Sequence, residues 1–471
     1  MKLCHFSFLI LLALAVSQSF GQTVIKGKLH GAVNQTVRYA DISAKANFPL
    51  YCKKTKTDSK GNFRITLNTE SPTFFWVAPE KAKLNYMIVK PDGKYKVEFG
   101  QEGENFKIKG TDAELNTFYS NLPHQALQAL KKLGRDGDIH KKAKAKKVAE
   151  YKALDSLTKL KKLSQEVLNA IKRDRALFYA EQDILLSIRS PEPFKTVGEA
   201  LRLANDPQYK TCVAFLPLTE SIIKAKVRSD KSYSREKMRA LAKQGKAHTF
   251  TVNTAKKYFE EPVKEAFIAY YIHERAFQKR FEKELVSLFD EFKQSYPASS
   301  FTPHVQPLVS KIEAFHKKVA QPAPDNIHFV ENPKTVTSLE ELLKKFKGQK
   351  LYVDVWATWC GPCKTEFEHN KELKKLLKRK GINVLYISID RPDREKAWNE
   401  MIRYYELEGS HIRAEKPLVK DLEKIFGNGG GLSIPWYMLI DENGDIVKKR
   451  ASRPADLQSL ENEISVSFKS L

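Results

Sequence analysis

The stretch from Tyr352 to Lys364 reads Tyr-Val-Asp-Val-Trp-Ala-Thr-Trp-Cys-Gly-Pro-Cys-Lys, and it decides the fold of the C-terminal part of the chain. It begins with a run of β-branched and aromatic residues, interrupted by Asp354, that predicts a buried strand. The two cysteines follow directly, at the start of a segment rich in Leu, Lys and Glu that predicts a helix. A pair of thiols is therefore expected where a strand gives way to a helix.

The position of this pair favours thiol chemistry. At the N-terminus of a helix, unpaired backbone amides and the helix dipole stabilise a thiolate, so the pKa of Cys360 is expected to be low. Cys363, one turn further on, faces the same side and can close a small disulfide ring. A partly exposed thiolate attacks a substrate disulfide, and the second sulfur resolves the mixed disulfide. Gly361 and Pro362 make the turn compact, and proline costs little in the first helical turn.

Several features agree in order and spacing with a known family. Trp-Ala-Thr-Trp-Cys-Gly-Pro-Cys-Lys, Asp354 six residues before the first cysteine, and Ile434-Pro435 downstream resemble thioredoxin. More closely, they resemble the TlpA/ResA branch of exported thioredoxin-like oxidoreductases, over about the last 140 residues. The resemblance implies an α/β thioredoxin fold for residues 326–471 and thiol-disulfide exchange that needs no cofactor and no metal.

The resemblance also implies roles for residues around the pair. Cys360 is expected to be the attacking thiol and Cys363 the resolving one. Asp354 matches the family's buried carboxylate, whose desolvation raises its pKa enough to exchange a proton with Cys363. Glu366 matches an acidic residue that the ResA branch carries three positions after its second cysteine, and it would tune the thiols.

Further residues would bind the substrate. Pro435 is expected to be a cis-proline opposite the disulfide, which leaves the Ile434 backbone free to pair with an extended substrate segment. Trp356 and Trp359 would floor and flank the site, and Gly361 and Pro362 complete its surface. The chain departs from some thioredoxins at Tyr386, where those proteins carry a lysine paired with the buried aspartate.

Each assignment has a structural alternative. A Cys-x-x-Cys pair can bind zinc, but a closed site needs four ligands, and His369 alone does not complete one. Asp354 could be a strand-end residue bonded to backbone amides, and Glu366 could be a solvated helix residue. Ile434-Pro435 could form an ordinary trans turn.

The N-terminus resembles a secretory signal. Lys2 supplies positive charge, residues 8–16 form a short apolar core, and Ser19-Phe20-Gly21 offers small residues for cleavage. We expect residues 1–21 to be removed, together with Cys4. An uncleaved anchor is the alternative. Export places the protein in the periplasm or cell envelope, where dithiols are oxidised by default, so a protein that works reduced needs an electron source.

Four cysteines remain after such cleavage, and the local pair at 360 and 363 is the favoured disulfide. Cys52 and Cys212 could be buried thiols or could pair with each other. With 471 residues, the chain is too long for one core, and several domains are expected.

The region 22–111 predicts a small β-sandwich domain. Alternating apolar residues at Tyr95, Val97 and Phe99 suit half-buried strands, and Asp58-Ser59-Lys60-Gly61 and Pro91-Asp92-Gly93 supply turns. The region resembles β-sandwich modules that precede thioredoxin-like domains in exported Bacteroidetes proteins. In those modules an Asp-x-x-Gly-x-Phe motif forms a hairpin turn followed by a core phenylalanine.

The region 112–320 predicts a helical domain, with helical periodicity in segments such as 255–296. Prolines at 191, 193, 297, 303 and 307 are expected to divide it into several helices. The part from Lys131 to Arg175 is strongly basic, yet it carries no base-stacking pattern or nucleic-acid motif. We therefore expect a solvated helical face, with contact to an anionic surface as the alternative. The net charge of +25 concerns solubility and nonspecific partners, not catalysis.

Residues 321–325 predict a linker to the last domain. After it we expect a strand at 327–330, a helix opening with a capping box at Ser338, a strand at 382–389, and helices at 393–405 and 417–426. The glycine run 427–431 fits neither phosphate-binding fingerprint and indicates a helix stop. A hairpin formed by 436–440 and 445–449 and a final helix complete the domain.

Two classes of function are compatible with these features. The first is an exported thiol-disulfide oxidoreductase that reduces protein disulfides with electrons from a membrane thiol donor. The second is an envelope binding or assembly protein that uses the thioredoxin fold for docking. A disulfide oxidase or isomerase would differ from the first only in redox potential and dimerisation.

Overall fold

The computed structural model describes residues 22–42, 52–80, 82–134, 138–159, 163–187, 196–229, 234–322, 326–427 and 431–468. Two compact units make up the chain: one holds the residues up to His273 together with 290–305, and the other holds Glu274–Phe289 and the chain from Gln306 onward. The second unit thus joins parts of the predicted helical region to the cysteine pair. The predicted signal peptide, Pro191, Pro193, linker residues 323–325 and glycines 428–430 lie outside the described residues.

The N-terminal region forms two four-stranded sheets that share one core. The strand orders are β4-β1-β7-β8 and β3-β2-β5-β6. Inward residues of both sheets, such as Ile25, Val37 and Phe75, belong to one buried cluster. Tyr95, Val97 and Phe99 are buried, as their alternation predicts. The strands are β1 (Gln22–Leu29), β2 (Thr36–Ile42), β3 (Lys53–Lys56), β4 (Asn62–Asn68), β5 (Thr73–Pro79), β6 (Asn85–Val89), β7 (Lys94–Phe99) and β8 (Lys107–Gly110).

The turn at Asp58 corrects one expectation. Asp58 Oδ1 accepts from the backbone N–H groups of Lys60 and Asn62, and Phe63 enters the core as predicted. However, β3 and β4 on either side of the turn belong to different sheets. The motif therefore carries the chain from one sheet to the other and does not close a hairpin. A side-chain turn sets only the local bend, so it leaves the pairing partner open.

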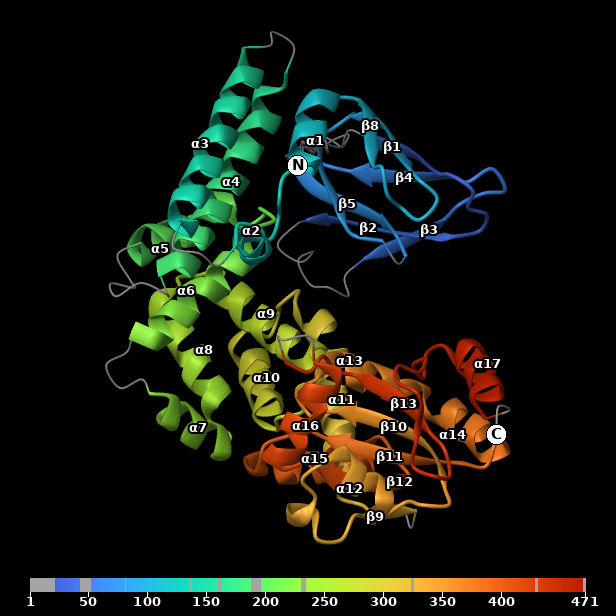
Figure 1. Ribbon diagram of the computed structural model, residues 1–471. Coiled ribbons are helices and arrows are strands. Elements are labelled where there is room, and N and C mark those ends of the chain that lie inside the picture. Colours follow the sequence, from blue (N-terminus) through green and yellow to red (C-terminus); the bar gives the residue numbers. More distant parts are fainter. Residues whose placement is uncertain are drawn as a thin grey trace, which may run out of the picture. The chain divides into compact units, whose positions relative to one another are not determined.

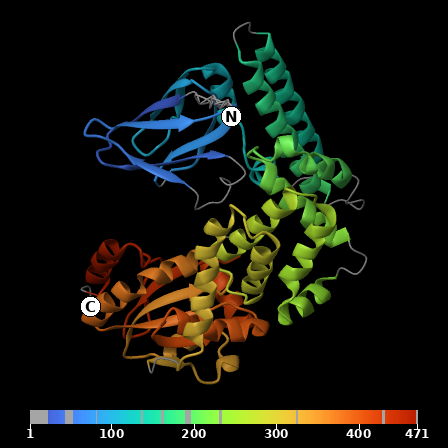
Figure 2. The same ribbon diagram turned by 180° about the vertical axis from the view of Figure 1, so that it is seen from behind.

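Helices follow the sandwich, and α3 and α4 lie side by side in both views (Figure 1, Figure 2). The predicted helical segment 255–296 spans three helices. The expectation that Pro307 interrupts a helix is wrong, because Pro307 lies inside α11. Val305 and Leu308 on either side of it are buried, and their packing stabilises the helix despite the proline. The helices are α1 (Ala113–Ser120), α2 (Ala126–Lys132), α3 (Ile139–Thr158), α4 (Gln165–Ser187), α5 (Val197–Asn205), α6 (Phe215–Ser229), α7 (Arg235–Lys243), α8 (Ala247–Tyr258), α9 (Val263–Phe277), α10 (Glu284–Ser295) and α11 (Thr302–Val319).

The C-terminal region forms a six-stranded sheet of order β14-β13-β10-β11-β12-β9. β10 pairs parallel to β11 and antiparallel to β13, which forms a hairpin with β14. This arrangement is a thioredoxin-like sheet, and β12 was not predicted. The strands are β9 (Ile327–Phe329), β10 (Lys350–Trp356), β11 (Ile382–Ser388), β12 (Gly409–Arg413), β13 (Trp436–Ile440) and β14 (Ile446–Lys448), and the helices are α12 (Leu339–Lys344), α13 (Gly361–Glu366), α14 (Asn370–Arg379), α15 (Glu395–Tyr404), α16 (Lys416–Phe426) and α17 (Leu457–Ser467).

Helices cover both faces of this sheet (Figure 1). Leu351, Val353 and Val355 face α12 and α16, whereas Tyr352 and Trp356 belong to the cluster on the opposite face, with α14, α15 and α17. Because side chains alternate along a strand, Asp354 lies on the same face as Tyr352 and Trp356. That cluster also contains both cysteines of the pair.

A segment from the predicted helical region packs into this second unit. The Phe281 ring, which lies between α9 and α10, stacks on Phe315 of α11 with 4.3 Å between ring centroids. Both rings also contact Tyr404 of α15. Three aromatic rings thus join segments as far apart in the sequence as residues 281 and 404, a separation of roughly the length of a small domain.

Across the part of the chain that the structure describes, none of the helices combines the length and apolarity that crossing a bilayer requires.

Candidate active site

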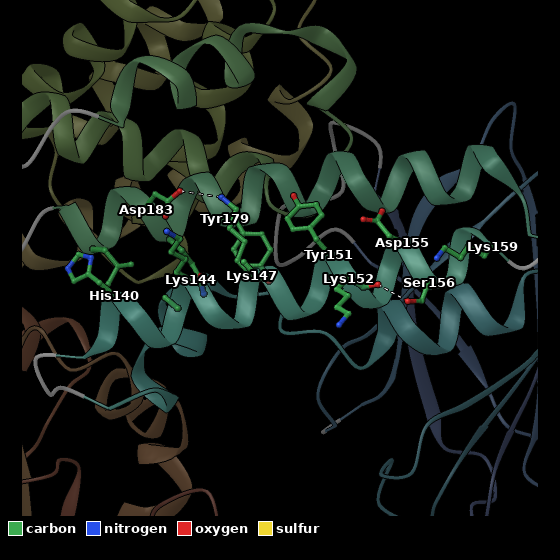
Figure 3. A pocket seen from close by; sticks show the side chains of 14 residues that line it. His140, Lys144, Lys147, Tyr151, Lys152, Asp155, Ser156, Lys159, Tyr179 and Asp183 are labelled. Atoms are coloured by element: carbon green, nitrogen blue, oxygen red, sulfur yellow. Dashed lines mark hydrogen bonds and ion pairs between the residues drawn. The ribbon is translucent and has the colours of Figure 1, made fainter.

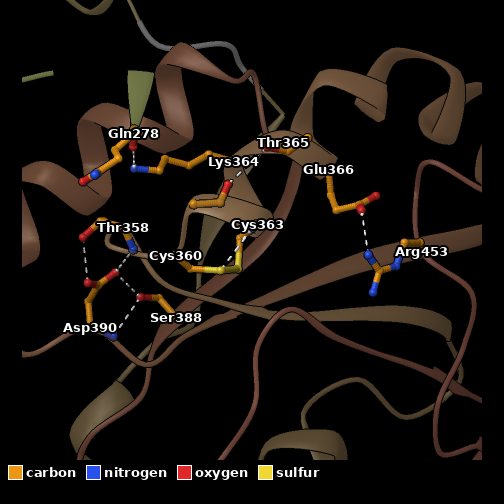
Figure 4. The surroundings of a disulfide bond; sticks show 11 residues. Gln278, Thr358, Cys360, Cys363, Lys364, Thr365, Glu366, Ser388, Asp390 and Arg453 are labelled. Atoms are coloured by element: carbon orange, nitrogen blue, oxygen red, sulfur yellow. Dashed lines mark hydrogen bonds and ion pairs between the residues drawn. A yellow bond between two sulfur atoms is a disulfide. The ribbon is translucent and has the colours of Figure 1, made fainter. Parts of the chain in front are cut away.

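The cysteine pair lies where the strand β10 meets the helix α13, as predicted. Cys360 and Cys363 are joined by a disulfide. Cys360 is the N-cap residue of α13, and its Sγ accepts from the backbone N–H of Cys363 at 3.1 Å (Figure 4). Cys360 is 4% exposed, so the expected partial exposure of its sulfur is wrong for the oxidised form, in which the residue packs into the core cluster. The Leu-rich helix is also interrupted by a 3₁₀ turn at Phe367–His369.

Around the disulfide, an exposed rim adjoins a buried floor. Trp359 is 52% exposed, whereas Trp356 is fully buried and meets the Phe367 ring edge-on. A methyl group added at Gly361 would meet no described atom within 4 Å, so this side of the pair is open. The peptide bond between Ile434 and Pro435 is cis, which excludes the trans turn.

Asp354 is buried beneath this region. It is 1% exposed and pairs in register with Tyr386 on one side and Tyr437 on the other. Its Oδ1 has no hydrogen-bond partner among the described residues, so the alternative of a carboxylate bonded to backbone amides gains no support. Burial, and secondarily the charge of Glu366, raises the pKa of Asp354 well above its usual value.

Glu366 is not a solvated helix residue. It is 5% exposed, and its carboxylate points away from the disulfide (Figure 4). Oε1 accepts from Arg453 Nη1 at 3.3 Å, and Oε2 accepts from the Ala455 N–H at 3.0 Å. The side chain therefore links α13 to the segment between β14 and α17. Its effect on Asp354 is electrostatic: the negative charge raises the pKa of Asp354.

A network that the sequence did not suggest holds the loop before Cys360. The buried carboxylate of Asp390 accepts from the Thr358 N–H and from Thr358 Oγ1, both at 2.7 Å, and from Ser388 Oγ at 2.9 Å (Figure 4). Arg394 donates to Thr358 Oγ1. The residue types alone carry no signal for this network, because Thr358 and Asp390 meet only through the pairing of β10 with β11.

Changing Thr358 to valine should test this network. The variant keeps the shape of the side chain but removes the hydroxyl that donates to Asp390. We expect the free energy of unfolding to fall by about 2 kcal/mol, because the lost hydrogen bond is made to a buried charged group. Chemical denaturation measures the change, and Thr365→Val, at an exposed position of α13, is the control. Equal losses in both variants would contradict a special role for Thr358.

The other two described cysteines are not joined to each other. Cys52 is half-buried. Cys212 is 1% exposed, and burial, together with the charge of Asp174, raises the pKa of its thiol well above the usual value. A neutral buried thiol is a poor nucleophile, so Cys212 is unsuited to disulfide exchange.

The basic stretch lies largely on α3. His140, Lys144, Lys147 and Lys152 line a groove of about 880 Å³ between α3 and α4, shown in Figure 3. Acidic groups also line it, and Lys147 pairs with Asp183 at 3.6 Å. The groove thus combines both signs of charge, and contact with an anionic surface stays a prediction.

Part of the chain is similar to known proteins. Residues 318–464 match the protein family described as Redoxin. The thiol-disulfide oxidoreductase ResA of Bacillus cereus is 32% identical over 108 residues, which are 23% of this chain and 57% of that protein. ResA of Oceanobacillus iheyensis is 31% identical over 104 residues, or 22% of this chain and 50% of that protein. The chain therefore spans little more than half the length of these curated relatives.

Solved structures also match about a quarter of the chain. One is the thioredoxin domain of a thiol-disulfide oxidoreductase from Bacteroides vulgatus, with 27% identity, coverage of 26% of this chain and 82% of that one, and a TM-score of 0.22. Another is a thiol:disulfide interchange protein from a Bacteroides species, with 25% identity, coverage of 27% and 76%, and a TM-score of 0.21.

Proposed function

We propose that this protein is an exported, TlpA/ResA-like thiol-disulfide oxidoreductase that reduces disulfides of envelope proteins, because residues 318–464 match the Redoxin family and the chain is similar to ResA proteins. The observation that carries the proposal is the Cys360–Cys363 disulfide at the N-cap of α13. There the Cys363 N–H already donates to Cys360 Sγ. An amide donor stabilises negative charge on sulfur, so it favours the thiolate that starts exchange.

The reaction would begin with both cysteines reduced. The Cys360 thiolate attacks one sulfur of a substrate disulfide, and the other substrate sulfur leaves as a thiolate that takes up a proton. The Cys363 thiolate then attacks Cys360 Sγ, which breaks the mixed disulfide and releases the second substrate thiolate. The substrate disulfide gains two electrons, and the Cys360–Cys363 pair loses them.

Asp354 would assist the second step. Burial raises the pKa of Asp354, and a carboxylate with a raised pKa is a stronger proton acceptor than an ordinary aspartate. Asp354 shares its sheet face with the cluster that contains Cys363. We propose that it accepts the Cys363 proton as the mixed disulfide is resolved.

Substrate binding would use the rim of the site. The exposed Trp359 ring and the open surface at Gly361 and Pro362 provide apolar contact beside the sulfurs. The resemblance adds Ile434 and Pro435 as the place where an extended segment pairs. A membrane thiol carrier would return electrons to the oxidised pair, because the envelope itself is oxidising.

The direction of electron flow can be tested by a redox titration. We expect the pair to equilibrate with glutathione at a potential nearer to about −270 mV, typical of thioredoxin, than to about −120 mV, typical of the oxidant DsbA. Gly-Pro between the cysteines supports this expectation. The reduced protein should also reduce a disulfide-bonded model protein. A potential near that of DsbA would show that the protein is an oxidase, and absent reduction would favour a docking role.

A further inference from the structure

Lys364, the residue after Cys363, is buried although it carries a charge. The residue is 1% exposed, and its Nζ donates to two backbone carbonyls, Gln278 O at 3.2 Å and Lys279 O at 3.0 Å (Figure 4). Burial, and secondarily the nearby Arg280, lowers the pKa of Lys364 to about 8. A buried ammonium is costly unless it is hydrogen-bonded, so these two carbonyls are essential partners.

The two carbonyls lie at the C-terminal end of α9. The helix ends in a Schellman motif, in which the Arg280 N–H bonds to Arg275 O and the Lys279 N–H bonds to Ala276 O. Gln278 and Lys279, whose carbonyls bind Lys364, are the two residues directly after the last residue of α9. A cation is favourable at this end of a helix, because the dipole is negative there. Lys364 therefore caps α9 from a helix more than 80 residues later in the chain, far beyond the reach of a local cap.

A second lysine makes the contact reciprocal. Lys279 Nζ donates to Lys364 O at 3.1 Å and to Glu368 Oε1 at 2.7 Å. Lys279 has φ +54, a left-handed conformation that favours glycine at this position of a Schellman motif. A lysine here suits the motif less well, but its side chain reaches the helix of the cysteine pair.

We propose that Lys364 and Lys279 form a latch that positions Cys363, so that residues 278–280 are a structural part of the redox site. This inference rests on the proposed function, since it concerns the same cysteine pair. Residues 278–280 lie outside the Redoxin match at 318–464. Lys364 is a positioning residue, because it holds the backbone next to Cys363 and not the reacting sulfurs.

The latch would act on the closing of the disulfide. When the disulfide opens, the two sulfurs must separate to van der Waals distance, and the first turn of α13 must yield. Holding Lys364 against α9 limits this movement and keeps the Cys363 sulfur close to Cys360. The effective concentration of Cys363 is then high, which favours the closed disulfide and speeds its attack on a mixed disulfide.

The first test replaces Lys364 by methionine in the full chain. Methionine keeps the length of the side chain but donates no hydrogen bond. We expect the equilibrium constant for oxidation by glutathione to fall about tenfold, which corresponds to about 30 mV. The rate at which a mixed disulfide on Cys360 is resolved should fall in the same direction. Lys375→Met, at an exposed position of α14, is the matched control and should leave both quantities unchanged.

The second test separates the latch from a general loss of stability. Lys279→Gly removes the reciprocal bonds but suits the left-handed backbone, so the free energy of unfolding should not fall. We expect its equilibrium constant with glutathione to shift in the same direction as in Lys364→Met, by about threefold or more.

The inference would be overturned if both variants kept the wild-type equilibrium constant. It would also be overturned if only Lys364→Met shifted it, because the effect would then come from the lost charge beside Cys363 and not from the latch. The glutathione equilibrium needs no protein substrate. A wild type that failed to reduce proteins would therefore refute the proposed function alone.

Discussion

Changing Cys360 to serine is expected to abolish the reduction of protein disulfides. A serine hydroxyl is far less acidic and less nucleophilic than a thiol, so the rate should fall by about a thousandfold or more. We expect that Cys363 does not replace it, because Cys363 lies inside α13 with no exposed surface and lacks the N-cap position of Cys360. Turnover of a disulfide-bonded model substrate, followed by the appearance of free thiols, measures the loss.

Two further variants make this result specific. Cys212→Ser should keep activity within about twofold, because Cys212 is a buried thiol with a raised pKa. Cys363→Ala should retain the attacking thiol and accumulate mixed disulfides, which non-reducing gels and mass spectrometry would identify. Full activity of the Cys360→Ser variant would refute the enzyme proposal. If a variant that lacks both Cys360 and Cys363 still bound the same partner proteins, a docking role would be favoured.

Changing Asp354 to asparagine is expected to make the protein more stable at high pH and less active. Unfolded aspartate ionises with a pKa of about 3.9, whereas burial raises the pKa of Asp354 in the native protein. Well below pH 3.9 both states bind the proton, and the difference in pKa does not affect stability. As the pH rises, the unfolded chain ionises first, so wild-type stability falls until the native pKa is reached.

Asparagine does not titrate and removes this penalty. We expect the difference in free energy of unfolding between Asp354→Asn and wild type to grow in favour of the variant as the pH rises from 4 to 8. Comparing the two pH values cancels the pH-independent effect of the substitution. Asp445→Asn, at an exposed position, is the control. A difference that stayed constant with pH would contradict a raised pKa.

The same variant should separate two steps of the reaction. Attack by Cys360 does not require Asp354, so mixed disulfides should form at a rate close to that of wild type. Their resolution by Cys363 should slow at neutral pH, because no proton acceptor remains at that position. Stopped-flow measurement of both phases would show this pattern, and equal slowing of both phases would argue for a structural role.

Local patterns explain which parts of the site could be predicted. The strand, the cysteine spacing and Asp354 lie within one short stretch, so alternation and helix position indicate their burial and orientation. The N-cap at Ser338 is likewise confirmed by its bond from the Glu341 N–H, whereas the Glu341 carboxylate, the other half of the predicted capping box, accepts from the Thr337 N–H. Each of these features depends on residues a few positions apart.

The missed features depend on contacts between distant segments. Asp390 meets Thr358 because β10 and β11 pair, and Lys364 meets Lys279 because α9 ends beside α13. Lys364 belongs to the motif around the cysteine pair, but the motif does not indicate that its side chain is buried, and Lys279 belongs to no pattern that distinguishes it from the other lysines of this basic chain. The Asp58 turn shows the same limit, since its local bend was predicted while the sheet that follows was not.

The aromatic cluster of Phe281, Phe315 and Tyr404 limits where the chain can be cut into fragments. A fragment that starts at the sequence-predicted boundary, residue 326, would lose two of the three rings and leave the third facing water. Exposed aromatic surface promotes association, so such a fragment should be poorly soluble. A fragment for biophysical work, or a domain to be transferred into another protein, would therefore need to include the segments that carry Phe281 and Phe315.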